Sequence, residues 1–369
     1  MKLFDQYKRI VIKIGSSIII DSSNNKVNKR WMNSVSKDID ILRKKGKEIT
    51  IVSSGSIALG KKFISKNGNF LKLEDKQASA AIGQIELINN WQQSLKKFDI
   101  KSAQILLTLN DSESRKRYIN AQKTLRSLLN KKFIPIVNEN DTVATEEIRF
   151  GDNDRLAARV AQMTNADLLL ILTETEGMYE KNPKKNPNAK KIDIIKSIDD
   201  KIESYADKTR SKFGSGGMQT KLWAAKICVS SGCSMTIASG IKNNPIQKIN
   251  LNNSSWFINN KNKKSAKKQW IINHLNIMGE IRIDNGATKA IRNNKSLLPA
   301  GIVKIKGKFD IGDAVAIYNN NNVKIAVGLS AYNHNDIIKI IGKKSKEIKS
   351  ILGFLKNEEF IHKDDLVLA

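Results

Sequence analysis

Short apolar runs that end in glycine or serine turns alternate with helical patterns along the N-terminal part of this 369-residue chain. The run from Arg9 to Ile14 is rich in β-branched residues and leads into Gly15-Ser16-Ser17, and the run 48–52 leads into Ser53-Ser54-Gly55. Such runs are typical of buried strands that enter tight turns. Strands that alternate with helices form a mostly parallel sheet covered by helices on both faces. The pattern therefore predicts an α/β fold.

The same alternation continues to residue 238 and predicts where ligands bind. In a parallel sheet of this kind, ligands bind beyond the carboxyl ends of the strands. Further strands are predicted at 103–108, 133–137, 167–172 and 234–238, with helices at 78–95, 118–129, 155–163 and 219–229.

The pattern changes after residue 250. Residues 252–268 are rich in Lys and Asn without a sustained period, which is typical of a linker. The short apolar runs that follow predict a small, mainly β domain. They lie at 280–284, 302–305, 314–318 and 324–327. We divide the chain into a first domain at 1–252, a linker at 253–275 and a second domain at 276–369.

Composition limits the class of protein. The formal charge of +28 would suit a nucleic-acid partner, but Lys, Asn and Ile are abundant together throughout the chain, which also indicates compositional bias. No run of about 18 apolar residues occurs, so we expect a soluble cytoplasmic protein without a membrane span. Cys228 and Cys233 are distant from His274, His334 and His362, which argues against a zinc site. We interpret the two cysteines as small core residues.

A Gly-rich stretch from Gly214 to Lys221 precedes a helical pattern that begins at Leu222. Backbone N–H groups at a helix start bind anions, and glycine lets the backbone approach a phosphate closely. With a lysine in the first turn, the stretch predicts a nucleotide phosphate site. A flexible loop before an ordinary helix is the alternative.

Two polar loops supply clustered carboxylates and amides. Asn138-Glu139-Asn140-Asp141 follows a predicted strand, and Gly151-Asp152-Asn153-Asp154 precedes a predicted helix. Such groups can grip an ammonium, bind a carboxylate, or hold lysines or a metal. Surface turns with a helix N-cap are the alternative. Lys13 lies within an apolar strand, where an unpaired charge is costly, so we expect it to have a partner.

These motifs, in this order, resemble those of the glutamate 5-kinases, which belong to the amino acid kinase family. The resemblance implies an amino acid kinase domain followed by a PUA-like domain. The segments that carry it are 11–17, 53–57, 138–141, 151–154 and 214–221 in the first domain, and 284–287 and 297–302 in the second.

The resemblance implies roles for particular residues. Lys13 and Lys221 would stabilise the transferring phosphoryl group, and Asp154 would orient both lysines. The residues implied for glutamate binding are Ser54, Asp141 and Asn153. Those implied for the ATP site are Lys13, Thr173, Glu174, Ser215, Gly216, Gly217, Met218, Gln219, Thr220 and Lys221. Glu174 stands where the family more often has Asp, and Ser215 where Thr is frequent. No residue is assigned as a metal ligand.

The implied reaction uses ATP and Mg²⁺ to convert L-glutamate to L-glutamate 5-phosphate, the first step of proline biosynthesis. The γ-carboxylate is already ionised near neutral pH, so this nucleophile needs no general base. The resemblance also implies feedback inhibition by proline and a homo-oligomer, either a dimer or a tetramer. Two alternatives stay open. One is a related kinase for aspartate, N-acetylglutamate or a nucleotide monophosphate, and the other is an RNA-binding protein that uses its PUA-like domain.

Overall fold

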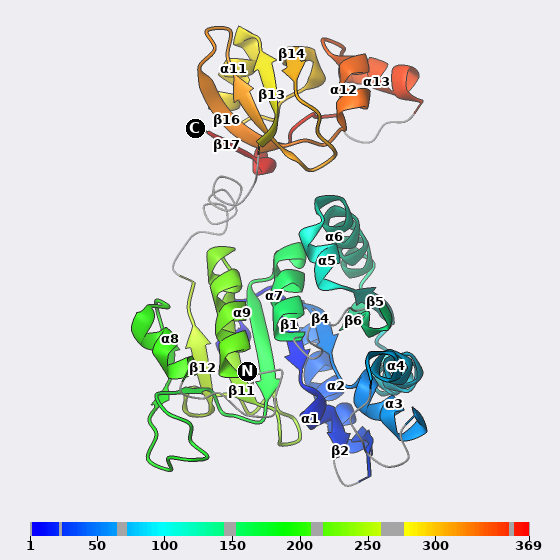
Figure 1. Ribbon diagram of the computed structural model, residues 1–369, viewed down its shortest axis with the longest axis vertical. Helices are drawn as coiled ribbons and strands as arrows, with labels where there is room; N and C mark the ends of the chain where they lie inside the picture. Colours follow the sequence, from blue (N-terminus) through cyan, green and yellow to red (C-terminus); the bar gives the residue numbers. More distant parts are fainter. Residues whose placement is uncertain are drawn as a thin grey trace. The chain divides into compact units, whose positions relative to one another are not determined.

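The computed structural model describes residues 2–21, 24–64, 72–143, 153–207, 217–259, 277–353 and 358–368 (Figure 1). The chain forms two compact units, the first comprising Met1–Glu113 and Asn120–Asn260 and the second comprising Ser114–Ile119 and Lys261–Ala369. In the described residues, no helix combines the length and the apolar character that crossing a membrane requires.

The first unit is built on an eight-stranded sheet with the order β10-β12-β11-β7-β1-β4-β6-β5. The pairs from β11 to β5 are all parallel, whereas β12 is antiparallel to β11. This confirms the predicted α/β fold. The strands are β1 Arg9–Ile14, β4 Glu48–Ser53, β5 Ser102–Leu107, β6 Ile134–Glu139, β7 Leu168–Thr173, β10 Ile194–Ile195, β11 Ser234–Ser239 and β12 Ser254–Phe257.

Helices connect these strands. The described residues also form two small hairpins outside the main sheet. The helices are α1 Ser16–Ile19, α2 Lys29–Lys44, α3 Ser56–Ile64, α4 Leu73–Lys96, α5 Leu109–Glu113, α6 Arg115–Asn130, α7 Asn153–Thr164, α8 Asp200–Asp207 and α9 Met218–Ser230. The hairpins pair β2 Ile20–Asp21 with β3 Lys26–Val27, and β8 Met178–Tyr179 with β9 Lys191–Ile192. Short 3₁₀ turns lie at Lys2–Phe4, Asp141–Val143 and Leu251–Asn253.

Helix α2 was not among the predicted helices. Its apolar residues Trp31, Val35 and Ile39 recur every four positions and are buried, so one stripe of the helix faces the core. The side chain of Asn28 caps its first turn by accepting a hydrogen bond from the backbone N–H of Trp31 at 3.0 Å.

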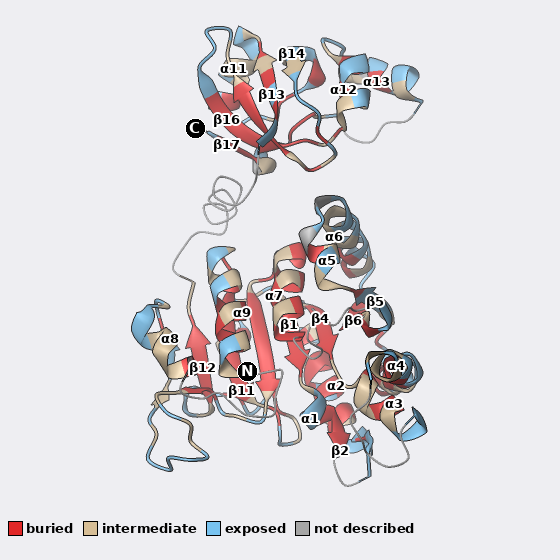
Figure 2. Ribbon diagram, in the orientation of Figure 1, coloured by how far each residue is buried: buried red, intermediate tan, exposed pale blue. Residues whose placement is uncertain are grey.

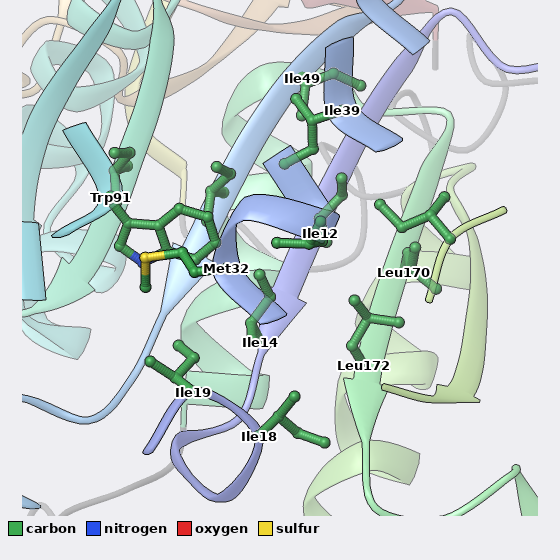
Figure 3. Packing of buried hydrophobic residues seen from close by; sticks show 14 of the residues in the cluster. Ile12, Ile14, Ile18, Ile19, Met32, Ile39, Ile49, Trp91, Leu170 and Leu172 are labelled. Carbon is green, nitrogen blue, oxygen red and sulfur yellow. The ribbon is translucent and has the colours of Figure 1, made fainter. Parts of the chain in front are cut away.

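The two faces of β1 have different roles. Side chains alternate along a strand, so Ile10, Ile12 and Ile14 point to one face. There they join the main apolar cluster with residues of α2 and α4, including Met32 and Trp91 (Figure 3). Figure 2 shows the central strands of the sheet as buried. The alternation directs Lys13 to the opposite face, and that places its charge away from the apolar cluster.

Helices α3 and α4 approach each other closely through two glycines. A Cβ added to Gly60 would lie 1.9 Å from the backbone oxygen of Ser79, and one added to Gly83 would lie 1.9 Å from the backbone oxygen of Ser56. Neither contact leaves room for a side chain. The two glycines therefore set the distance between α4 and the start of α3.

The second unit contains a five-stranded sheet with the order β14-β13-β15-β16-β17. This confirms the predicted small β domain, although the helices α11, α12 and α13 found among its described residues were not predicted. Its apolar core includes Ile281, Ile317 and Phe360. The elements are β13 Ile277–Ile283, α11 Asn285–Arg292, β14 Ile302–Lys306, β15 Ala314–Tyr318, β16 Lys324–Leu329, α12 His334–Ile340, α13 Ser345–Leu352 and β17 Leu366–Leu368, with 3₁₀ turns at Pro299–Gly301 and Lys363–Asp365.

One strand lies inside the range predicted as a linker. Residues Ser254–Phe257 form β12, which pairs with both β10 and β11 in the first sheet. The strand is buried although its flanks are polar, because it inserts between two neighbouring strands. Residues 260–275 of the predicted linker lie outside the described residues.

The contact between α3 and α4 can be tested with Gly83→Ala. Alanine is the better helix former by about 1 kcal/mol, but the added methyl group would overlap a backbone oxygen that no side-chain rotation can move. We expect a net loss of roughly 2 kcal/mol in unfolding free energy, measured by urea denaturation. Ala81→Ser, at an exposed position of the same helix, is the control. An unchanged urea midpoint for Gly83→Ala would contradict this description of the contact.

Candidate active site

Three charged side chains from three elements meet at the carboxyl end of the sheet. Lys13 of β1 and Lys221 of α9 both bind Asp154 of α7, with Nζ–Oδ1 and Nζ–Oδ2 distances of 2.7 and 3.0 Å. Lys13, Lys221 and Asp154 are only 7, 6 and 1% exposed. The expected partner of the lysine in β1 is therefore Asp154, and two ammonium groups share this single carboxylate.

The electrostatics of Asp154 follow from this pairing. Burial alone would raise the pKa of the carboxyl group, but the ammonium groups of Lys13 and Lys221 outweigh burial and hold that pKa well below its usual value. Asp154 is also the second residue of α7, where the helix dipole favours a negative charge. The carboxylate is therefore ionised at neutral pH and fixes the positions of both ammonium groups.

The start of α9 lies beside this cluster. Gly217 is its N-cap, and Met218, Gln219 and Thr220 form its first turn. The hydroxyl of Thr220 lies 3.1 Å from Oδ2 of Asp154 and 2.9 Å from the backbone oxygen of Gly217, which links the turn to the cluster. Two residues assigned to the ATP site, Ser215 and Gly216, lie outside the described residues.

The remaining residues assigned to the ATP site follow β7. Thr173 is the last residue of that strand, and its backbone oxygen accepts a hydrogen bond from the N–H of Gly240 at 2.8 Å. Glu174 is exposed and lies 3.6 Å from the ammonium of Lys184. An exposed pair at this distance contributes little to stability, so the Glu174 carboxylate remains accessible to a ligand.

Asn153 joins the end of β4 to the end of β6. The two hydrogens of its Nδ2 face three acceptors: the backbone oxygen of Ser53 at 2.9 Å, Oγ of Ser54 at 2.7 Å and Oδ1 of Asn138 at 2.9 Å. Asn153 is buried, and it precedes Asp154 directly. The start of α7 therefore contributes one residue to the lysine cluster and the adjacent residue to a neighbouring polar cluster.

Asp141 belongs to this polar cluster, where Ser56 at the start of α3 donates to its Oδ2 at 3.2 Å. Burial raises the pKa of Asp141 to about 6, and the hydrogen bond from Ser56 lowers it only in part. No ion pair of Asp141 is found among the described residues. A buried carboxylate in this state is suited to a ligand that brings a positive charge.

The structure brings the predicted substrate residues Ser54, Asp141 and Asn153 into one hydrogen-bonded network. The same network contains Ser56, Asn138 and Gln84, which were not assigned to the site. Asn138 belongs to the polar loop that the sequence singles out, so its position was a usable signal. Gln84 lies in the middle of α4, where no local pattern marks it.

The arrangement offers two kinds of chemistry at one sheet edge. The lysine cluster presents ammonium donors, which suit a phosphoryl group because negative charge spreads over its oxygens during transfer. The adjacent polar cluster presents the carboxylate of Asp141 and the amides of Asn138 and Asn153, which suit a small molecule with an ammonium group. The site therefore fits a kinase whose acceptor is a small amino compound.

Comparison with known proteins gives the family of the chain. A family model described as "Amino acid kinase family" matches residues 8–239. A curated glutamate 5-kinase of Pelagibacter ubique is 49% identical over 361 residues, covering 98% of this chain and 98% of the relative. The glutamate 5-kinase of Agrobacterium fabrum is 47% identical, covering 98% of this chain and 93% of the relative.

The chain belongs to the amino acid kinase family and, within it, to the glutamate 5-kinases. A PUA domain model matches residues 279–352, so this glutamate 5-kinase carries a C-terminal PUA domain. Among solved structures, a carbamate kinase from Giardia lamblia bound to AMP-PNP matches with a TM-score of 0.50 and 14% identity, covering 69% of this chain and 99% of that chain. That likeness supports the fold of the first unit.

The unusual state of Asp141 predicts how the stability of this glutamate 5-kinase varies with pH. Because its folded pKa of about 6 exceeds the ordinary 3.8, ionisation of Asp141 opposes folding as pH rises through 6. Asp141→Asn removes that charge. At pH 7.5 we expect the variant to be more stable by roughly 2 kcal/mol, and the difference to shrink as pH falls from 7 to 4.

Urea denaturation of both proteins at several pH values measures this difference. Asp5→Asn serves as the control, because Asp5 is an exposed carboxylate whose pair with Lys45 contributes little. A stability difference between wild type and Asp141→Asn that does not vary with pH would contradict the raised pKa.

Proposed function

We propose that this site transfers the γ-phosphoryl group of ATP to the γ-carboxylate of L-glutamate, giving L-glutamate 5-phosphate, the first step of proline biosynthesis. Similarity to curated glutamate 5-kinases over nearly the whole chain supports this reaction. The observation that carries the proposal is the buried cluster of Lys13, Asp154 and Lys221. It supports the proposal because two neighbouring ammonium groups suit a phosphoryl group whose oxygens share negative charge during transfer.

In this mechanism the glutamate γ-carboxylate is the nucleophile, and it needs no general base because it is already ionised. Catalysis then consists of aligning it with the γ-phosphate and neutralising the charge that develops. Lys13 and Lys221 supply that neutralisation, and Asp154 is a positioning residue that holds both. The product carboxyl phosphate and ADP leave without a covalent enzyme intermediate.

The turn after β1 leaves space for the phosphates. A Cβ added to Gly15 would lie 4.0 Å from Nζ of Lys13, so a larger side chain there would fill the space beside the ammonium group. Gly15 lacks that side chain, which supports access of an anion to Lys13. Among the described residues, no group of three or more acidic, His or Cys side chains is placed to hold a metal. We therefore treat Mg²⁺ as part of the substrate MgATP.

The polar cluster around Asp141 supports glutamate as the acceptor. Asp141 is buried without an ionic partner among the described residues, and the α-ammonium of glutamate would supply one. N-acetylglutamate carries no such charge at that nitrogen. The polar cluster therefore favours glutamate over N-acetylglutamate.

Three further properties belong to the proposal. We expect proline to inhibit the enzyme by feedback, and we expect the chain to assemble as a dimer or a tetramer. We also expect it to work in the cytoplasm, where ATP is supplied. The resemblance to glutamate 5-kinases supports each of these properties.

The reaction itself is tested by trapping the product with hydroxylamine. An acyl phosphate reacts to give a hydroxamate, so we expect ATP-dependent γ-glutamyl hydroxamate from L-glutamate and none when Mg²⁺ is omitted. L-Aspartate and N-acetylglutamate are the comparison substrates. Hydroxamate formed preferentially from either comparison substrate, or none formed from glutamate, would overturn the proposed function.

The roles of the lysines predict a particular kinetic effect. Replacing Lys13 or Lys221 with Met keeps most of the side-chain volume but removes a charge that stabilises the transition state. We expect kcat to fall by at least about 100-fold, while KM for glutamate changes only a few-fold.

Lys226→Met is the matched control for Lys221→Met, because Lys226 lies on the same helix but is exposed and pairs with Glu203. The control should keep nearly full turnover. Circular dichroism establishes that each variant is folded. Wild-type turnover in a folded Lys13→Met or Lys221→Met variant would exclude that lysine from the catalytic role.

A further inference from the structure

The orientation of the Asn153 amide is fixed by the group that it faces. Its Nδ2 lies 2.9 Å from the backbone oxygen of Ser53, which can only accept a hydrogen bond. The atom facing that oxygen must therefore be the NH₂ group. The same NH₂ group reaches Oδ1 of Asn138 at 2.9 Å, so Asn138 must present its oxygen to Asn153.

This constraint passes through Asn138 to two further residues. With its oxygen facing Asn153, Asn138 turns its NH₂ group toward Oε1 of Gln84 at 2.7 Å and Oγ of Ser56 at 3.5 Å. Ser56 in turn donates its one hydroxyl proton to Asp141 at 3.2 Å. The described hydrogen bonds of this network therefore run in one direction, from Asn153 outward to Gln84 and Asp141.

The directed network leaves one buried acceptor without a partner among the described residues. Oδ1 of Asn153 is buried in a residue that is 4% exposed, and it has no hydrogen-bond partner among the described residues. A buried acceptor without a partner is costly, so a ligand that donates a hydrogen bond there is strongly favoured. Asp141 adds a second acceptor through its carboxylate. Both carboxylates of glutamate only accept, and its ammonium is the one group that donates.

We propose that Gln84 of α4 is a positioning residue for recognition of the substrate ammonium: by accepting from Asn138, it holds the Asn138 oxygen against the Asn153 amide. This steadies the orientation, set by the backbone oxygen of Ser53, in which the Asn153 oxygen is left for that ammonium. This inference rests on glutamate being the acceptor substrate. It gives Gln84, in the middle of α4, a role in substrate selection.

The position of Gln84 depends on the close contact between α3 and α4. Gly83, the preceding residue, lies against the backbone of Ser56, so Ser56 and Gln84 reach Asn138 from two helices in contact. If the acceptor at position 84 is removed, the NH₂ group of Asn138 keeps only its long contact with Ser56. Asn138 then holds its oxygen less firmly against Asn153, whose orientation rests on the backbone oxygen of Ser53.

Three variants test the proposal. Gln84→Leu removes the acceptor, and Gln84→Glu keeps it, because a carboxylate oxygen can accept from Asn138 in the same way. Gln92→Leu makes the same chemical change at an exposed position of α4 and is the matched control. Each variant is assayed for KM of glutamate, KM of ATP and inhibition by glutarate, which resembles glutamate but lacks the ammonium group.

We expect Gln84→Leu to raise KM for glutamate about 5- to 10-fold, the effect of one lost hydrogen bond. KM for ATP and the inhibition constant of glutarate should stay within about twofold of wild type, since neither ligand uses the acceptor. Gln84→Glu and Gln92→Leu should keep the wild-type KM for glutamate. The ratio of glutamate to glutarate affinity therefore falls only in Gln84→Leu.

Other outcomes would overturn the proposal. Equal weakening of glutamate and glutarate, or of glutamate and ATP, would mean that Gln84 only supports the fold. The same rise in KM for Gln84→Leu and Gln84→Glu would mean that the acceptor atom is not what matters. The wild-type hydroxamate assay separates these results from a failure of the proposed function, since without product from glutamate the substrate assignment fails first.

Discussion

The buried ion cluster of Lys13, Asp154 and Lys221 is the interaction on which the site depends. Its members come from β1, α7 and α9, which are distant in the sequence, and each charge loses its hydration on folding. Such burial is tolerated only when the charges pair closely, and loss of one member of a buried pair typically costs about 3–5 kcal/mol. The cluster therefore ties the assembly of the sheet edge to the formation of the proposed phosphoryl site. A chain that misplaces α7 or α9 also leaves an ammonium unpaired.

The neighbouring polar cluster differs from the ion cluster in that its charge is not paired. The carboxylate of Asp141 is buried there without an ionic partner among the described residues. Burial raises the pKa of Asp141, and the hydrogen bond from Ser56 compensates only partly. In the proposed function, the ammonium group of the substrate would recover the stability that this costs at neutral pH. The α3–α4 contact supports this arrangement, because Gly60 and Gly83 bring Ser56 and Gln84 within reach of Asn138. Packing and recognition are therefore properties of the same helix pair.

Much of this architecture could be predicted from sequence, and the exceptions have physical causes. The strands of the first sheet are β-branched runs that end in turns, and a lysine inside such a run required a partner. Strand β12 was placed in a linker because its flanks are polar, and only pairing with β10 and β11 makes it a strand. Helix α2 combines an apolar stripe with many polar residues. Gln84 carries no local signal, because its role comes from Asn138, which is 54 positions away.

The first turn of α7 explains how the two halves of the site are coupled. Asn153 and Asp154 are consecutive, and successive residues on a helix point in directions about 100° apart. Asn153 therefore reaches the ends of β4 and β6, while Asp154 reaches β1 and α9. One side chain organises acceptors for a cation, and the next organises donors for an anion. Any movement of this turn would displace both ligands together. Because a single turn of helix orders both sets of groups, the proposed alignment of a substrate carboxylate with a phosphoryl group would be built into the backbone.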